Sequence, residues 1–257
     1  MMFVEYKRRM QAKSAALLLS IETRLDRLMM AWLLVAGLAS ALRIATSQLQ
    51  APLNAAGLFP YLLLIVAPFA SMVLALRWFA DGDRLPRPKL RLARAGQWRP
   101  VSASAARAHP LYGAGGLMVS LLVGMLINVP VRAAEYLAAM PALSGQVPAW
   151  LSTLHMVMTL DVVLLSSLYT IAFVAALRRV PMFPRLLAAI WMIDLVMQLS
   201  IAKVTVAVGG LPVDVAAALQ GLLEGNVKKV LISIALWLPY LLLSTRVNVT
   251  YRSRIPA

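Results

Sequence analysis

The sequence lacks cysteine altogether and contains only two histidines and ten acidic residues among its 257 positions. Without cysteine there can be no disulfide, no thiolate metal ligand and no cysteine nucleophile. His109 and His155 do not form a cluster with metal-ligand spacing, so no metal site is predicted. No strand is expected, and hence no Gly-rich phosphate loop that follows one. These absences argue against an enzyme and against a bound cofactor.

Charge is also scarce. Charged residues make up 14% of the chain and hydrophobic residues 61%, where about 25% and roughly 45–50% are usual. The apolar residues form six blocks, most of which approach the ~20 residues that a helix needs to cross ~30 Å of hydrocarbon. They lack the strict alternation of a lipid-facing barrel. The sequence therefore predicts an all-α polytopic transmembrane bundle with six spans, near residues 29–47, 58–78, 113–131, 150–177, 186–207 and 229–245.

The basic residues predict an orientation for this bundle. With the N-terminus inside, 20 of the 25 Lys and Arg residues fall on the inner side. Because basic loops remain in the cytoplasm, both termini are predicted to be cytoplasmic. The expected location is the bacterial inner (cytoplasmic) membrane. The net charge of +15 is explained by topology and lipid headgroups, so no nucleic-acid partner is expected.

The chain divides into four parts: a segment 1–27, a two-span module 28–80, a basic cytoplasmic loop 81–111 and a four-span module 112–257. In the first part, apolar residues recur at helical spacing, which fits an interfacial helix on the cytoplasmic leaflet or a soluble extension of the first span. A cleavable signal ending near 36–41 is a further alternative. The sixth span contains Pro239, where a kink is expected. Residues 211–226 are mildly amphipathic, and the sequence leaves open whether they lie along the outer face before it.

The basic loop is interrupted by prolines and serines, which argues against a packed domain. It is interpreted either as a solvated loop that sets the orientation or as a surface that docks a cytoplasmic partner or an anionic lipid. The residues assigned to this surface are Arg84, Arg87, Lys89, Arg91, Arg94 and Arg99.

The last part of the chain carries recognisable motifs. They are YGAGGLMVSLLVGMLINVPVR from Tyr112, the outer-loop PALSG, the inner-turn ALRRVPMFPRLL and the C-terminal LWLPYLLLSTRVNVTY. In these motifs, residues 112–252 resemble the small four-span bacterial membrane family catalogued as domain of unknown function 2569. The chain departs from that family at Leu117, where tryptophan is usual, and in its two additional N-terminal spans. The resemblance implies a four-span fold and no assigned chemistry.

Two carboxylates interrupt apolar spans. Asp161 and Asp194 are each expected near the midplane, on helices joined by a short turn. A charge at that depth is costly and rarely persists without use. Two facing carboxylates would resist sharing charge, so at least one is expected to be protonated. One interpretation is a proton or cation relay, and the other is two neutral acids hydrogen-bonded to Ser166, Thr159, Gln198 or a carbonyl.

His155 and Lys203 lie towards the outer face and are interpreted as snorkelling interfacial residues. Ser152, His155 and Asp161 do not form a catalytic triad, because Asp161 lies about two helical turns below the histidine.

Three small residues, Gly116, Ser120 and Gly124, recur at four-residue spacing and predict a ridge where a second helix can approach closely. The neighbour is either a helix of the same chain or another membrane subunit.

These features favour a non-catalytic inner-membrane protein that acts as a subunit or assembly partner of a larger complex. Its expected partners are the lipid bilayer and other membrane subunits. The alternative is a small proton-linked transporter or channel that uses the intramembrane carboxylates. No internal repeat is apparent, which disfavours a transporter.

Overall fold

The computed structural model describes residues 2–49, 51–52, 54–88 and 95–257. Within them the long helices are α1 (Met2–Thr23), α2 (Leu25–Thr46), α3 (Ala55–Trp78), α5 (Leu117–Ala139), α6 (Ala149–Leu177), α7 (Phe183–Val208) and α8 (Val213–Leu243). All of these except α1 are long and apolar enough to cross a membrane, which gives six candidate spans. The predicted all-α, six-span bundle is confirmed, and the protein is a multi-pass membrane protein.

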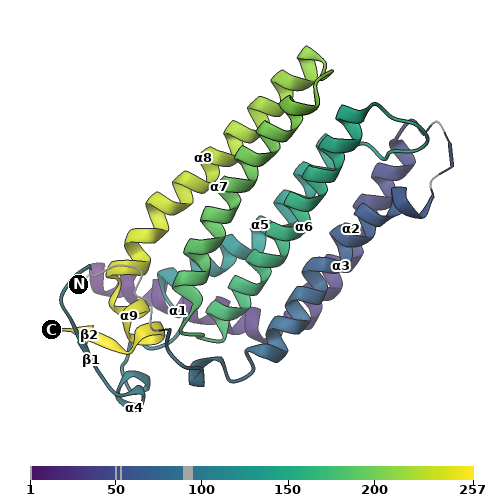
Figure 1. Ribbon diagram of the computed structural model, residues 1–257. Coiled ribbons are helices and arrows are strands. Elements are labelled where there is room, and N and C mark those ends of the chain that lie inside the picture. Colours follow the sequence, from purple (N-terminus) through teal and green to yellow (C-terminus); the bar gives the residue numbers. More distant parts are fainter. Residues whose placement is uncertain (1, 50, 53, 89–94) are drawn as a thin grey trace.

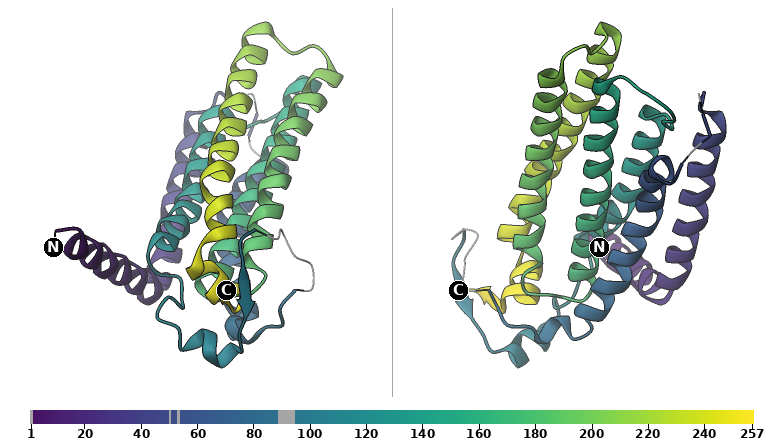
Figure 2. Two further views of the ribbon diagram at one scale, coloured as in Figure 1. Left: turned by 90° about the vertical axis from the view of Figure 1, so that its left-hand side faces the viewer. Right: turned by 45° about the vertical axis from the view of Figure 1, so that its right-hand side comes forward.

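Helix α6 forms the centre of the bundle. It packs against α3, α5 and α7, while α2 lies against α3 and α5, and α8 lies beside α7 (Figure 1). The first two spans therefore pack directly on the four that follow. Both chain termini lie at the same end, as six spans require (Figure 2). We call this the basic end, because the predicted orientation places most Lys and Arg residues there.

Helix α1 runs across the basic end, crosswise to the six spans (left view of Figure 2). Ile21 near its end and Leu25 at the start of α2 are buried. The backbone N–H of Gly116 donates to Ser14 Oγ at 3.2 Å and ties α1 to the start of α5. This orientation is the one that an interfacial helix adopts, and it does not continue the axis of the first span.

Residues 211–226 are not a segment separate from the last span. From Val213 on they form the first half of the 31-residue helix α8, which continues without interruption to Leu243. Gly209 and Gly210, both at φ +70°, end α7 and make the turn into α8. Leu219 and Leu223 then pack with buried residues of α5, α6 and α7. Because the apolar contacts continue along α8, the helix has no reason to break between these residues and the predicted span.

A small cap covers the basic end, and it corrects the expectation that the chain has no strands. Strand β1 (Trp98–Pro100), from the basic loop, pairs antiparallel with β2 (Arg254–Pro256) at the C-terminus. The turn η1 (Gly82–Arg84) and the short helices α4 (Ala103–Arg107) and α9 (Thr245–Arg252) complete the cap. Sequence patterns missed the two strands because three residues are too few to show alternation.

Gly82 allows the cap to approach the turn between α6 and α7. A Cβ atom at this position would lie 2.5 Å from the Arg178 carbonyl oxygen and 2.8 Å from Val180 Cγ2. Because backbone must move to relieve such a clash, we expect Gly82→Ala to cost roughly 1–3 kcal/mol of stability. Denaturation in detergent measures this loss. Gly37→Ala, in α2 where nothing lies within 4 Å, is the matched control and should cost nothing.

Candidate functional site

A buried arginine joins the two intramembrane carboxylates. Arg132 Nη1 donates to Asp161 Oδ2 at 3.3 Å, and Arg132 Nη2 makes an ion pair with Asp194 Oδ2. The three side chains come from α5, α6 and α7 and are at most 9% exposed, with Asp194 fully buried. The structure thus brings Asp161 and Asp194 together, but through a cation that lies one residue beyond the predicted span 113–131.

Neutral groups complete the coordination of these charges. Gln198 Nε2 donates to Asp161 Oδ1 at 3.0 Å and to Asp194 Oδ1 at 3.4 Å. The Tyr169 hydroxyl donates to Asp194 Oδ2 at 3.0 Å, and Arg132 Nε donates to Asn128 Oδ1 at 3.0 Å. We call these residues the Arg132 cluster: Asn128, Arg132, Asp161, Tyr169, Asp194 and Gln198. Every carboxylate oxygen in it accepts at least one hydrogen bond.

The polar contacts continue from the cluster to α8 and back to α5. Asn226 Nδ2 donates to Gln198 Oε1 at 3.2 Å, and Lys229 Nζ donates to Asn226 Oδ1 at 3.3 Å. Lys229 also makes an ion pair with Glu135 of α5. Glu135 and Lys229 are 34% and 58% exposed, so the path begins at the surface of the bundle and ends at fully buried Asp194.

The charge balance defines what the Arg132 cluster can do chemically. It holds two carboxylates and one guanidinium, whereas Glu135 and Lys229 balance each other. With both acids ionised the cluster has an excess negative charge, which is costly at this depth in a membrane. Uptake of one proton by the cluster would remove this excess charge. Of the suggested neutral partners, Gln198 is present, whereas Ser166 Oγ has no hydrogen-bond partner among the described residues.

His155 is buried, so the snorkelling interpretation is wrong for this residue. Its ring lies between helices, where Nε2 is 3.3 Å from the Tyr136 hydroxyl, and that hydroxyl is 2.8 Å from Thr159 Oγ1. The imidazole has a polar partner inside the bundle and does not need to reach the interface. Lys203 is exposed on α7.

The small-residue ridge does not pack inside the chain. Ser120 and Gly124 are exposed on the surface of α5, and nothing lies within 4 Å of a Cβ placed on Gly124. Gly116 precedes α5 at φ +65°, where the guanidinium of Arg246 lies 3.4 Å from the position of its Cβ. The internal-packing interpretation is therefore wrong. Gly116 instead provides the positive φ at which the chain enters α5.

The basic-loop surface is only partly described. Arg84 lies 3.6 Å from Asp81, Arg87 is exposed, and Arg99 belongs to β1. Lys89, Arg91 and Arg94 lie outside the described residues.

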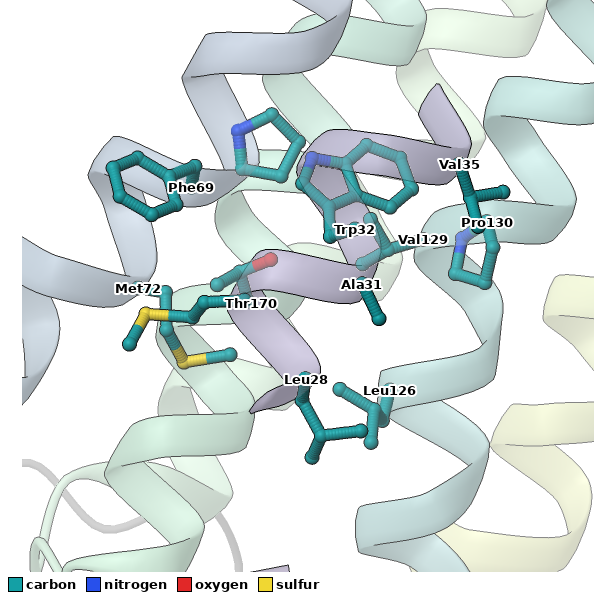
Figure 3. A pocket seen from close by; sticks show the side chains of 12 residues that line it. Leu28, Ala31, Trp32, Val35, Phe69, Met72, Leu126, Val129, Pro130 and Thr170 are labelled. Atoms are coloured by element: carbon teal, nitrogen blue, oxygen red, sulfur yellow. The ribbon is translucent and has the colours of Figure 1, made fainter. Parts of the chain in front are cut away.

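An apolar pocket of about 230 Å³ lies between α2, α3 and α5 (Figure 3). Trp32, Phe69, Met72 and Pro130 are among its walls. Thr170 also lines the pocket, and its hydroxyl donates to the Ser166 carbonyl oxygen at 2.7 Å. The pocket suits an aliphatic chain and offers no reactive group.

The described residues contain no cluster of three or more His, Cys, Asp or Glu side chains that could hold a metal ion. No family model, no curated protein and no solved structure matches this chain.

Proposed function

We propose that this protein is a non-catalytic subunit or assembly partner of a larger complex in the bacterial inner membrane. The observation that carries the proposal is the outer part of the α7–α8 hairpin, residues 206–222, which we call the hairpin tip. Figures 1 and 2 show it rising above the outer ends of the other spans.

Helix length explains why the tip protrudes. At 1.5 Å per residue, the 31 residues of α8 extend about 46 Å, against ~30 Å of hydrocarbon. Counted from Leu243 at the basic end, about 20 residues cross the hydrocarbon, and the residues before about 223 extend beyond it.

The hairpin tip is nevertheless apolar. Val206 and Val213 are 78% and 86% exposed. Between α7 and α8 lies a groove of about 690 Å³, with Leu211, Ala216 and Leu219 among its walls. Outside the hydrocarbon, exposed apolar surface of this kind is typical of a protein–protein contact. Another membrane subunit that covers the tip would remove it from water.

Purification in mild detergent, followed by native electrophoresis and mass spectrometry, tests the proposal. We expect the protein to migrate as part of a larger assembly and to bring a defined membrane protein with it. A cross-linker placed at Val213 should join the two. Migration as a free monomer at all detergent concentrations, with no cross-linked product, would refute the assembly role.

A second candidate, proton-linked transport, is favoured by the excess negative charge of the Arg132 cluster and by its polar path to Glu135. If protons cross through this cluster, Asp161→Asn removes the extra carboxylate but keeps the Arg132–Asp194 pair. Proton flux in reconstituted vesicles should then fall to the level of empty vesicles. Asp214→Asn, an exposed acid in the first turn of α8, is the control that should retain flux. Wild-type protein that moves no protons at any pH would eliminate this candidate.

The resemblance of residues 112–252 to the four-span family is compatible with either candidate, because it implies no chemistry.

A further inference from the structure

A cavity of about 500 Å³ lies between α3 and α6 near their outer ends, opposite the basic end. The two helices pack against each other (Figure 1), and the loop that leads into α6 contributes to the outer wall. Met156 and Leu160 of α6 line the cavity and are exposed on the surface of the bundle. The cavity is therefore open towards the surrounding lipid. We call it the α3–α6 cavity.

Polar and apolar groups of the α3–α6 cavity are separated by depth. Asn54 and Ser152 line it at the outer ends of their helices, and His155 lies about one turn deeper. Leu160 and Val163 line its inner half. At 1.5 Å per residue, His155 is about 9 Å and Val163 about 21 Å below the start of α6. This order suits a molecule whose polar end lies near the headgroups and whose apolar part extends towards the middle of the bilayer.

The lining also restricts the charge of such a molecule. Among the described residues, no Asp, Glu, Lys or Arg side chain lines the cavity. A phosphate or carboxylate would find no cation here, and an amine would find no acid, so burial of either charge would be costly. A molecule that occupies the cavity is therefore neutral at its polar end.

The hydrogen bonds around His155 determine which ring nitrogen is available to a ligand. The Thr159 hydroxyl donates its only proton to the His155 carbonyl oxygen at 2.7 Å. The Tyr136 hydroxyl, 2.8 Å from Thr159 Oγ1, must therefore be the donor of that pair. Since the Tyr136 proton is used there, the 3.3 Å contact with His155 Nε2 requires Nε2–H as the donor. A neutral imidazole that carries its proton on Nε2 has a lone pair on Nδ1.

His155 Nδ1 is thus an acceptor in need of a donor. The residue is only 8% exposed and lines the cavity. No described residue donates a hydrogen bond to Nδ1, and Nδ1 is not one of their fully enclosed atoms without a partner, so it is accessible from the cavity. The acyl chain of a bilayer lipid would leave this acceptor unsatisfied in hydrocarbon, which is costly. A hydroxyl group would satisfy it.

We propose that the α3–α6 cavity binds a neutral, membrane-soluble molecule with a hydroxyl group at its polar end. The hydroxyl donates to His155 Nδ1, and the apolar part lies against Leu160 and Val163. An aliphatic lipid alcohol and a phenol such as a quinol share this chemistry. The site lies apart from the hairpin tip and does not depend on the proposed assembly role.

Competition between two ligands in native mass spectrometry tests the hydroxyl requirement. The purified full-length protein is released from detergent micelles that contain equal amounts of farnesol and farnesyl methyl ether. Because the ether cannot donate to Nδ1, wild type should retain farnesol over the ether by about tenfold, as expected for one lost hydrogen bond. Each variant is compared with wild type in the same mixture, so unequal partitioning of the two ligands into micelles cancels.

Two substitutions of His155 test the acceptor. His155→Leu and His155→Asn both lose the contact with Tyr136, but only asparagine keeps an acceptor oxygen close to the position of Nδ1. The preference for farnesol should disappear in His155→Leu and return in part in His155→Asn. Equal ratios in the two variants, or no preference in wild type, would refute the hydroxyl site.

A change of volume tests the cavity without altering its hydrogen bonds. Met156 is exposed to lipid, so Met156→Trp should fold normally and, by filling the cavity, reduce retention of both ligands. Met192→Trp, on the exposed surface of α7 outside the cavity, should behave like wild type. Similar retention by the two tryptophan variants would place the ligand elsewhere and overturn the proposal. A further competition between farnesol and decylubiquinol distinguishes the two sources, because the ligand retained in excess shows whether the hydroxyl belongs to an aliphatic chain or to a phenolic ring.

Discussion

Replacing Arg132 with methionine is expected to destabilise the folded protein by about 3–5 kcal/mol, the usual cost of removing one partner from a buried ion pair. The substitution leaves Asp161 and Asp194 buried without their cation. Gln198 and Tyr169 still donate hydrogen bonds, but neutral donors do not compensate for two like charges. The acids must then take up protons or separate, and either change opposes folding.

The loss of stability in Arg132→Met should come from uncompensated charge and not from lost side-chain volume. Methionine fills much of the space of the arginine stem, and the triple variant Arg132→Met, Asp161→Asn, Asp194→Asn removes all three charges together. We expect the triple variant to recover most of the lost stability, since apolar or neutral replacements of whole buried charge groups are often tolerated.

Unfolding with increasing SDS in mixed micelles measures both effects. Arg77→Met, at the exposed end of α3, controls for the removal of a positive charge and should change stability little. If the triple variant were as unstable as Arg132→Met alone, packing around residue 132 would be the cause, and the electrostatic explanation would be wrong.

Asp161 and Asp194 were recognisable in the sequence, whereas their common partner was not. An acid in the middle of an apolar block is conspicuous because its hydration is lost there. Arg132 instead lies where hydropathy declines, near Glu135, so the span was expected to end at residue 131. The helix continues to Ala139 because Arg132 and Glu135 are compensated by residues of α6, α7 and α8. Such contacts between distant segments have no signature in one sequence.

The same difference between local patterns and contacts of distant segments explains which parts of the fold were predictable. Six spans were predictable because hydrocarbon selects continuous apolar helices. The two strands of the cap were not, because β1 is stable only against β2 at the other end of the chain. Likewise, His155 was expected at the interface on grounds of polarity, but Tyr136 gives it a partner inside the bundle.

The double variant Val206→Asp, Val213→Asp is expected to abolish co-purification of the proposed partner and leave the isolated protein stable. Both side chains are exposed at the hairpin tip, which we propose lies outside the hydrocarbon. An acid there remains hydrated in the free protein, so folding should be unaffected. In an assembled complex the two carboxylates would be buried against apolar surface, where unpaired charges cost several kcal/mol. A loss of about 1.4 kcal/mol already weakens binding tenfold.

Two controls separate docking from membrane insertion. Val206→Leu, Val213→Leu, which keeps both exposed positions of the tip apolar, should preserve the complex. Leu38→Asp, on the exposed surface of α2 near the middle of its span, should reduce insertion and yield, because an acid in hydrocarbon costs about 2.5–3.5 kcal/mol. Loss of yield in the tip variant, equal to that of Leu38→Asp, would show that lipid surrounds the tip. An unchanged yield with the partner still bound would show that the partner docks elsewhere. Only normal yield and stability together with loss of the partner support assembly through the hairpin tip.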